Sequence, residues 1–314
     1  MVVNRITGFD TMLATPLPRT SRISRTPLRR IPSFEPHPGV EVWAKLEWLQ
    51  PGGSIKARAA RAILAEALPR LNGRRLLDAS SGNTAIAYAT FCAAAGLPLT
   101  LLVPANASRE RLRQLALLGA EVRLTDPLEG TEGARDAARV LAEEAPERFV
   151  WLDQYANPAN WQAHRDSTAP EIWSSTRGRI THFVCGLGTT GTFTGTTLGL
   201  RARSPHIRCI EVQPETALHG LEGWKHLDSV PAPDIYRPGL ADGRVTVATE
   251  AAHRTLLRAA RSEGLVLSPS SAANLSAAAA LAATLDRGVV VTVFPDDASK
   301  YGDCLDRLLP LLRP

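Results

Sequence analysis

The sequence contains little of what several classes of protein depend on. Its four cysteines, Cys92, Cys185, Cys209 and Cys304, are scattered over 314 residues, with no C-x-x-C pair and no histidine spacing typical of zinc. We therefore expect no metal site and, from the unpaired cysteines, a reducing cytoplasm as the location. The N-terminus lacks a basic stretch followed by an apolar one, so no signal peptide is predicted.

Charge of one sign and aromatic residues are also scarce. Subtracting 31 acidic from 36 basic residues leaves +5, and residues 1–30, with six arginines and one aspartate, account for that whole excess. With only 5% aromatic residues and mixed charge elsewhere, we expect no nucleic-acid partner, and residues 1–30 are interpreted as a docking or solvated segment. The uncharged residues 83–107 are broken at Gly96-Leu97-Pro98, which predicts a buried helix and strand rather than a membrane span.

Lysine is unusually rare. Of the 36 basic residues only four are lysines, so 32 are arginines. Arginine replaces lysine readily on surfaces but not where an amine must lose its proton. Each of Lys45, Lys56, Lys225 and Lys300 is therefore a somewhat better functional candidate than an average lysine, with retention by chance as the alternative for each.

What is present is an alternation of short apolar runs with Ala-, Leu- and Arg-rich stretches of helical pattern. At 44% hydrophobic residues the chain is long enough for two domains, and we predict an open α/β fold with parallel strands whose halves meet near residue 150. Residues 230–243, rich in proline and glycine, show no clear period. The expected strands are residues 40–46, 75–78, 99–103, 121–124, 182–185, 207–213 and 289–294, and the expected helices are 55–67, 83–95, 108–118, 130–144 and those after residues 192, 249 and 270.

The string G-L-G-T-T-G at residues 186–191 separates an expected strand from a helix. Glu211 follows Gly191 by twenty residues, so the spacing matches the dinucleotide-binding fingerprint. A cluster of hydroxyls at the helix start instead favours a terminal phosphate dianion, which has more oxygens to satisfy than a pyrophosphate. A turn without a ligand is the third alternative. The hydroxyls belong to Thr189, Thr190, Thr192 and Thr194.

Three further segments begin helices. In G-G-S-I-K, residues 52–56, a partly desolvated lysine near a helix N-terminus would be a nucleophile able to form a Schiff base, although first-turn lysines are common. In S-S-G-N-T, residues 80–84, hydroxyls and free N–H groups would cradle a carboxylate, or simply cap the helix. The serines of S-P-S-S, residues 268–271, are typical caps. Ligands of open α/β sheets bind at the carboxyl ends of strands, where these segments converge.

These segments resemble, in order, the motifs of the cysteine synthase and cystathionine β-synthase family of pyridoxal-phosphate enzymes. The resemblance covers nearly the whole chain, from Thr26 to Pro295. It implies fold type II, which is similar to the tryptophan synthase β-subunit and has the cofactor between two open α/β domains. The implied domains are residues 45–150, with the substrate-carboxylate loop, and residues 1–44 with 151–314, with the phosphate loop. The motifs are A-K-L-E (44–47), P-G-G-S-I-K-A-R (51–58), S-S-G-N-T (80–84), Q-Y-A-N-P-A-N (154–160), G-L-G-T-T-G-T-F-T-G (186–195) and P-S-S-A-A (269–273).

The resemblance implies pyridoxal 5'-phosphate as the cofactor, bound by Lys56 through a Schiff base. Asn83 would bond the ring hydroxyl and Ser270 the pyridine nitrogen. The implied phosphate loop consists of Gly188, Thr189, Thr190, Gly191 and Thr192. The implied substrate residues are Ser80, Ser81, Gly82, Thr84 and Gln154 around the carboxylate, and Gly223 and Lys225 in a closing loop.

The implied reaction is β-replacement on O-phospho- or O-acetyl-L-serine by a sulfur nucleophile, through an α-aminoacrylate, giving L-cysteine or an analogue. A homodimer is implied, and a sulfur-carrier protein is a candidate partner. Alternatives are homocysteine or an amine as nucleophile, giving cystathionine or 2,3-diaminopropionate, a serine or threonine dehydratase, and a non-catalytic relative that binds a partner.

Four positions depart from the family pattern. Ala57 stands where aspartate is usual, and Ala85, Thr190 and Ala272 stand where glycine is usual. We expect the added methyl groups to narrow the loops around the site. Thr190, together with a lysine such as Lys225 in the closing loop, resembles the branch that uses phosphoserine.

Overall fold

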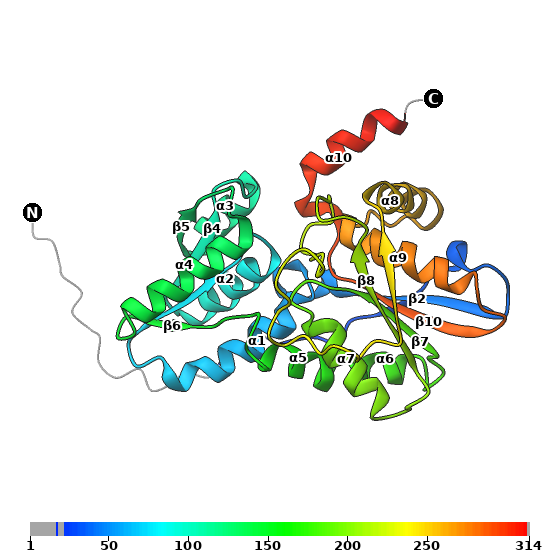
Figure 1. The fold of residues 1–314 in the computed structure, drawn as a ribbon, viewed down its shortest axis with the longest axis horizontal. Helices are drawn as coiled ribbons and strands as arrows, with labels where there is room; N and C mark the ends of the chain where they lie inside the picture. Colours follow the sequence, from blue (N-terminus) through cyan, green and yellow to red (C-terminus); the bar gives the residue numbers. More distant parts are fainter. Residues whose placement is uncertain (1–16, 18–21, 313–314) are drawn as a thin grey trace, which may run out of the picture.

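The computed structural model describes residue 17 and residues 22–312. Its strands form two sheets (Figure 1), in which all neighbouring strands of the described chain run parallel except β1 and β2. This confirms the predicted parallel α/β fold. The larger sheet has the order β1 (Leu28–Arg30), β2 (Val40–Leu46), β10 (Gly288–Phe294), β7 (His182–Gly186), β8 (Arg208–Pro214), β9 (Gly243–Val247), and the smaller has β5 (Glu121–Thr125), β4 (Leu99–Pro104), β3 (Arg75–Ala79), β6 (Phe149–Trp151).

Helices cover both faces of the larger sheet (Figure 1). On one face lie α8 (Thr249–Glu263) and α9 (Pro269–Ala282), and on the other α6 (Ala169–Ser175) and α7 (Gly191–Arg201). The short helix α5 (Ala159–Ala163) lies between α7 and α1. Successive residues of β10 point to opposite faces, so Val290 packs in the α9 core and Val291 in the α7 core. Because both faces are covered, β10 is apolar throughout rather than alternating.

The smaller sheet is covered in the same way. On one face lie α1 (Lys56–Ala67), α2 (Asn83–Ala95) and α3 (Arg109–Leu117), and on the other α4 (Gly130–Glu144). Leu76 packs against the first group and Leu77 against α4, so β3 is also apolar on both sides. The loops after β3 and β7 therefore leave their sheets at carboxyl ends, where ligands of such sheets bind.

The expected elements are present, with ends shifted by one or two residues, but several others were missed. β1 and β6 have three residues each, too few for a period to appear. β9 follows the proline- and glycine-rich stretch as an edge strand with exposed residues. Beyond the last expected strand, α10 (Gly302–Leu308) projects from the body of the molecule (Figure 1).

The division into two domains stays a prediction, but sheet membership bears on its boundaries. β2 continues to Leu46 in the larger sheet, one residue beyond the predicted start of the 45–150 domain. β6 ends at Trp151 in the smaller sheet, one residue beyond the predicted end.

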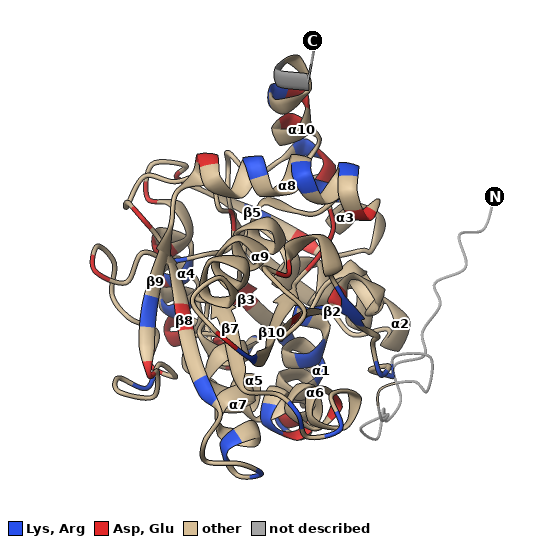
Figure 2. Ribbon diagram, turned by 90° about the vertical axis from the view of Figure 1, so that its right-hand side faces the viewer, with Lys and Arg blue, Asp and Glu red and all other residues tan. Residues whose placement is uncertain are grey.

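The described part of the basic N-terminal segment contacts the body of the protein; residues 1–16 and 18–21 lie outside the described residues. Arg25 donates to Ser174 and Ser175, Arg29 pairs with Glu263, and Arg30 with Glu35. Figure 2 shows basic and acidic residues interspersed elsewhere, for example along α8. Across residue 17 and residues 22–312, no helix combines the length and the apolar character needed to cross a membrane.

Candidate cofactor and substrate site

A cavity of about 200 Å³ lies where the loops after β3 and β7 meet the start of α1. Eleven predicted site residues line it: Lys56, Ser80, Ser81, Gly82, Asn83, Thr84, Gln154, Gly188, Thr189, Gly223 and Lys225. Thr190, Gly191, Thr192 and Ser270 are not among the lining residues. Six lining residues were not predicted: Arg111, Thr131, Tyr155, Glu222, Trp224 and Tyr301.

Lys56 is the first residue of α1 and faces this cavity. The turn before it places Gly52 and Gly53 at φ 72° and 67°, a left-handed conformation that favours glycine. Burial lowers the pKa of Lys56, and the nearby carboxylate of Asp296 opposes that shift only in part. More of the amine is therefore neutral, which is the form able to act as a nucleophile or a base.

The loop of residues 80–84 joins β3 to α2. Ser80 Oγ accepts from the N–H groups of Gly82 and Ala85, each at 3.3 Å, and so satisfies an N–H of the first turn of α2, whose N-cap residue is Gly82 rather than a serine or asparagine. Thr84 donates to Gln154 Oε1 at 2.7 Å, and Gln154 Nε2 donates to a β3 carbonyl at 3.0 Å. These bonds hold the predicted carboxylate residues together at a helix N-terminus, which favours an anion.

The glycine-rich loop between β7 and α7 is tightly enclosed. A Cβ on Gly188 would lie 2.3 Å from the Gly223 carbonyl, and one on Gly191 would lie 2.0 Å from Asn160 Oδ1, so only glycine fits at either position. Thr190 precedes α7 at φ 69°, an uncommon conformation for threonine, and its buried hydroxyl has no hydrogen-bond partner among the residues that the structure describes. An unpartnered hydroxyl at a helix N-terminus suits a phosphate.

The dinucleotide interpretation does not fit this structure. Glu211, which would bind a ribose, is buried in β8. Its carboxylate accepts from Arg244 Nε at 2.7 Å and from the Tyr236 hydroxyl at 3.1 Å. Because Arg244 and Tyr236 already bind this carboxylate, Glu211 is not available to bind a ribose, and the spacing from Gly191 to Glu211 does not indicate a dinucleotide site.

The serines before α9 have separate tasks. Ser268 Oγ accepts from the Ser271 N–H at 3.1 Å and caps the helix, and Ser271 donates to the Asp296 carbonyl at 2.6 Å. Ser270 is 5% exposed and its hydroxyl lies 3.2 Å from that of Ser268. Ser270 therefore has hydrogen-bonding capacity left that Ser268 and Ser271 have already used.

Two cations on the cavity wall are held by carboxylates. Lys225 pairs with Glu132 and lies 4.8 Å from the centre of the Tyr155 ring, so the alternative of a solvated lysine is wrong. Arg111 pairs with Glu222 at 2.6 Å. Nothing local distinguishes Arg111 in an arginine-rich helix, which is why sequence reasoning missed it.

The expected narrowing of the loops by extra methyl groups is wrong at two of the three positions where glycine is usual. Ala85 and Ala272 are each 0% exposed and pack in hydrophobic cores, and so does Ala57, whose side chain is smaller than the usual aspartate. None is among the residues that line the cavity. Their methyl groups add apolar contacts behind the loops, and only Thr190 lies in a loop itself.

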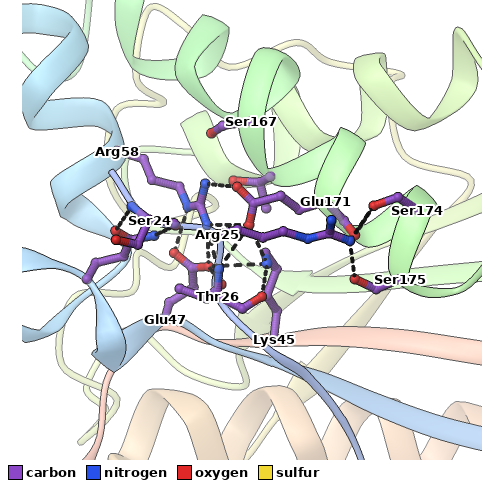
Figure 3. Close-up of polar contacts among 12 residues, drawn as sticks. Ser24, Arg25, Thr26, Lys45, Glu47, Arg58, Ser167, Glu171, Ser174 and Ser175 are labelled. Carbon is purple, nitrogen blue, oxygen red and sulfur yellow. Dashed lines mark hydrogen bonds and ion pairs between the residues drawn. The ribbon is translucent and has the colours of Figure 1, made fainter. Parts of the chain in front are cut away.

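A buried network of ion pairs surrounds the guanidinium of Arg58 (Figure 3). Arg58, two residues along α1, pairs with Glu47 at 2.7 Å and Glu171 at 2.8 Å, and Lys45 pairs with Glu171 at 2.6 Å. Thr26 donates to Glu47 at 2.6 Å. We call these residues the hinge network, because they join α1, whose core belongs to the smaller sheet, to β2 and α6. Lys45 is thus a structural lysine.

Comparisons with known proteins agree with this geometry. Residues 19–296 match the family model described as pyridoxal-phosphate dependent enzyme. The cysteine synthase of Aquifex aeolicus is 45% identical over 289 residues, which cover 89% of this chain and 88% of the relative. The O-acetylserine dependent cystathionine beta-synthase of Bacillus subtilis is 35% identical, covering 90% and 94%. The crystal structure of Entamoeba histolytica cysteine synthase superposes with a TM-score of 0.86 at 26% identity, covering 100% and 95%.

The site fits the cofactor of this family, because the cavity is lined by Lys56, whose pKa burial lowers, and by Gly188 and Thr189 of the loop before α7. The chain belongs to the pyridoxal-phosphate-dependent enzymes of fold type II that include the cysteine synthases.

Proposed function

We propose that this protein replaces the β-substituent of an activated L-serine, O-acetyl- or O-phospho-L-serine, with a sulfur nucleophile to give L-cysteine or an analogue. One observation carries the proposal: Lys56, whose pKa is lowered by burial, lines a cavity. The N-terminus of α2 and the loop before α7 line the same cavity. An amine beside two anion-binding positions suits an amino-acid substrate and a phosphorylated cofactor. The names of the relatives point the same way.

In this proposal Lys56 holds pyridoxal phosphate covalently, and residues 188–192 hold its phosphate. Asn83 bonds its ring hydroxyl and Ser270 its ring nitrogen. When bound, the cofactor supplies an electron sink for negative charge at the substrate α-carbon. Ser270 is neutral and would not keep the pyridine nitrogen of the cofactor protonated. The cofactor would therefore be a modest electron sink, which favours elimination over a long-lived carbanion.

The remaining steps belong to the chain itself. Lys56 Nζ, in its free amine form, would take the substrate α-proton and later return it. Ser81, Thr84 and Gln154 hold the substrate carboxylate at the start of α2. The loop containing Gly223 covers the cavity, which keeps water from competing with the sulfur nucleophile.

The leaving group would lie toward the wall that contains Lys225. A phosphate there would take Glu132's place beside the Lys225 ammonium, which binds phosphate as a point charge. An acetyl group would leave the Lys225–Glu132 pair intact. Thr190 and Lys225 together favour phosphoserine as a donor beside acetylserine.

We further propose that the protein is a homodimer in the cytoplasm and that a sulfur-carrier protein is a candidate source of sulfur. Sedimentation of the purified holoenzyme tests the dimer. A single sedimenting species with the mass of one chain would contradict it.

The deciding experiment offers O-acetylserine, O-phosphoserine, serine and threonine to the holoenzyme and monitors loss of the β-substituent. Sulfide, homocysteine and an amine are then added separately, and the products are identified by mass. Cysteine as the main product supports the proposal. Pyruvate or 2-oxobutyrate from unactivated serine or threonine would indicate a dehydratase, whereas no reaction with any donor would indicate a binding protein.

A further inference from the structure

Lys300 belongs neither to the lining of the cavity nor to the hinge network. It ends the short turn Ala298–Lys300 that follows β10. Its ammonium donates to three oxygens: the Gly52 carbonyl at 3.2 Å, the Gly53 carbonyl at 2.9 Å and Asn83 Oδ1 at 2.7 Å. An ammonium has three N–H groups, so each one has an acceptor. A residue far along the chain thus joins the turn before Lys56 to the loop before α2.

The contacts around Asn83 fix which way its side-chain amide points. Its oxygen accepts from Lys300, and its nitrogen donates to Asp296 Oδ2 at 2.8 Å. Asp296 is in turn held by the Tyr301 hydroxyl at 2.7 Å. A cation at the oxygen and a carboxylate at the nitrogen admit only one orientation of the amide, because a rotation of 180° would make both contacts repulsive.

This orientation leaves a donor for the cavity. The amide nitrogen has two hydrogens, and Asp296 takes one of them. Asn83 lines the cavity, so the second hydrogen is the group it can offer there, whereas its oxygen is directed to Lys300. Burial lowers the pKa of Lys300, and Asp296 and Asp297 oppose the shift, so the same carboxylates help to keep the ammonium charged.

We propose that Lys300 is a positioning residue for the cofactor site: it holds the Asn83 amide so that an N–H donor, and not the oxygen, faces the cofactor ring hydroxyl. The proposal rests on the role proposed for Asn83. The carbonyls of Gly52 and Gly53 anchor the ammonium, and Gly53 allows its close approach, because a Cβ there would lie 3.3 Å from Lys300 Nζ. Without the ammonium, only the Asp296 contact still fixes the amide, so the orientation that offers an N–H to the ring oxygen is held less firmly.

The test is the absorption spectrum of the holoenzyme without substrate, because the balance between long- and short-wavelength bands of the cofactor responds to hydrogen bonding at its ring oxygen. We expect Lys300→Met, which keeps the length of the side chain, to change this band ratio by about fivefold, as suits the loss of one hydrogen bond. Asn83→Ala should change it in the same direction. In the double variant, Lys300→Met should add nothing to Asn83→Ala.

Two controls separate positioning from general damage. Lys300→Arg keeps the charge and the donors and should restore most of the band ratio. Arg307→Met removes an exposed cation from α10 and should leave the ratio unchanged. Spectra recorded with saturating added cofactor correct for any weaker binding.

An unchanged ratio in Lys300→Met would overturn the proposal, and so would an equal further change in the Asn83→Ala background. Because no substrate is present, these outcomes do not depend on the reaction. A parent protein that binds the cofactor but replaces no β-substituent would contradict the proposed function and leave the spectral comparison valid.

Discussion

Two groups of ion pairs, the hinge network and the pairs of the cavity wall, differ in how far water reaches them. In the hinge network the side chains of Lys45, Glu47 and Arg58 are 0% exposed and that of Glu171 is 14% exposed. On the cavity wall the cations are nearly as buried, but their partners are not: the side chain of Glu132 is 36% exposed and that of Glu222 is 53% exposed. The wall carboxylates can move into water, whereas those of the network cannot.

This difference in exposure separates fixed pairs from exchangeable ones. A buried charge that loses its partner keeps the whole penalty of leaving water, so the hinge network holds one arrangement. A wall cation can change partners, because its carboxylate is solvated when released. The fixed pairs anchor the helix that begins at Lys56, and the exchangeable pairs lie at the cavity.

The largest effect is expected at Lys56, the first residue of the helix that the fixed pairs anchor. Lys56→Ala should lower turnover by about 10²- to 10⁴-fold or more while stability changes little, because Lys56 faces a cavity and the hinge network stays intact. Borohydride reduction of the yellow parent protein, followed by peptide mapping, should label the peptide with Lys56. Label on Lys45, Lys225 or Lys300 would contradict the assignment.

Breaking the hinge network should lower the free energy of unfolding. Arg58→Met leaves Glu47 and Glu171 with too few partners and should lower the free energy of unfolding by about 3–5 kcal/mol. Urea denaturation monitored by circular dichroism measures the change. Arg139→Met, which breaks an exposed pair with Glu143, is the matched control and should cost about 0.5 kcal/mol or less. Similar losses in the two variants would contradict the expectation that the buried network is costlier to break than an exposed pair.

A buried hydroxyl should behave differently from a buried charge. Ser270→Ala should retain the cofactor, since most affinity is expected from Lys56 and the phosphate loop, but slow elimination by roughly 10- to 1000-fold. Bound cofactor is quantified by absorbance, and elimination by stopped-flow. If the variant loses all cofactor, Ser270 has been assigned to the wrong part of the ring.

The smallest effect is expected from a change at the cavity wall, where a substrate phosphate would replace Glu132 beside Lys225. Lys225→Ala should reduce kcat/KM for phosphoserine by about 10- to 100-fold and leave acetylserine nearly unchanged. Glu132→Gln removes the competing carboxylate and should change phosphoserine turnover in the opposite direction. Steady-state kinetics with both donors decides the matter, and equal losses for both donors in Lys225→Ala would refute phosphate recognition by this lysine.

Local pattern was sufficient for much of the fold. The apolar runs of β10 and β4 and the helix starts near Lys56, Asn83 and Gly191 could be predicted, because periodicity and caps are properties of neighbouring residues. Short strands such as β6 could not, because three residues in a strand depend on pairing with β3. Elements with a hydrophobic period of their own were predictable from the sequence. Short strands that depend on pairing with another strand were not.

The same distinction applies to the site. The motifs around Lys56, residues 80–84 and residues 186–191 are local, and the sequence alone predicted that they would converge at strand ends. The tertiary structure alone decided which groups are already partnered, such as Lys225 with Glu132 and Glu211 with Arg244. It also brought Lys300 to Asn83 across 217 positions of the chain. A hydrogen bond requires two groups at one point in space, and no pattern among neighbours encodes where two distant segments meet.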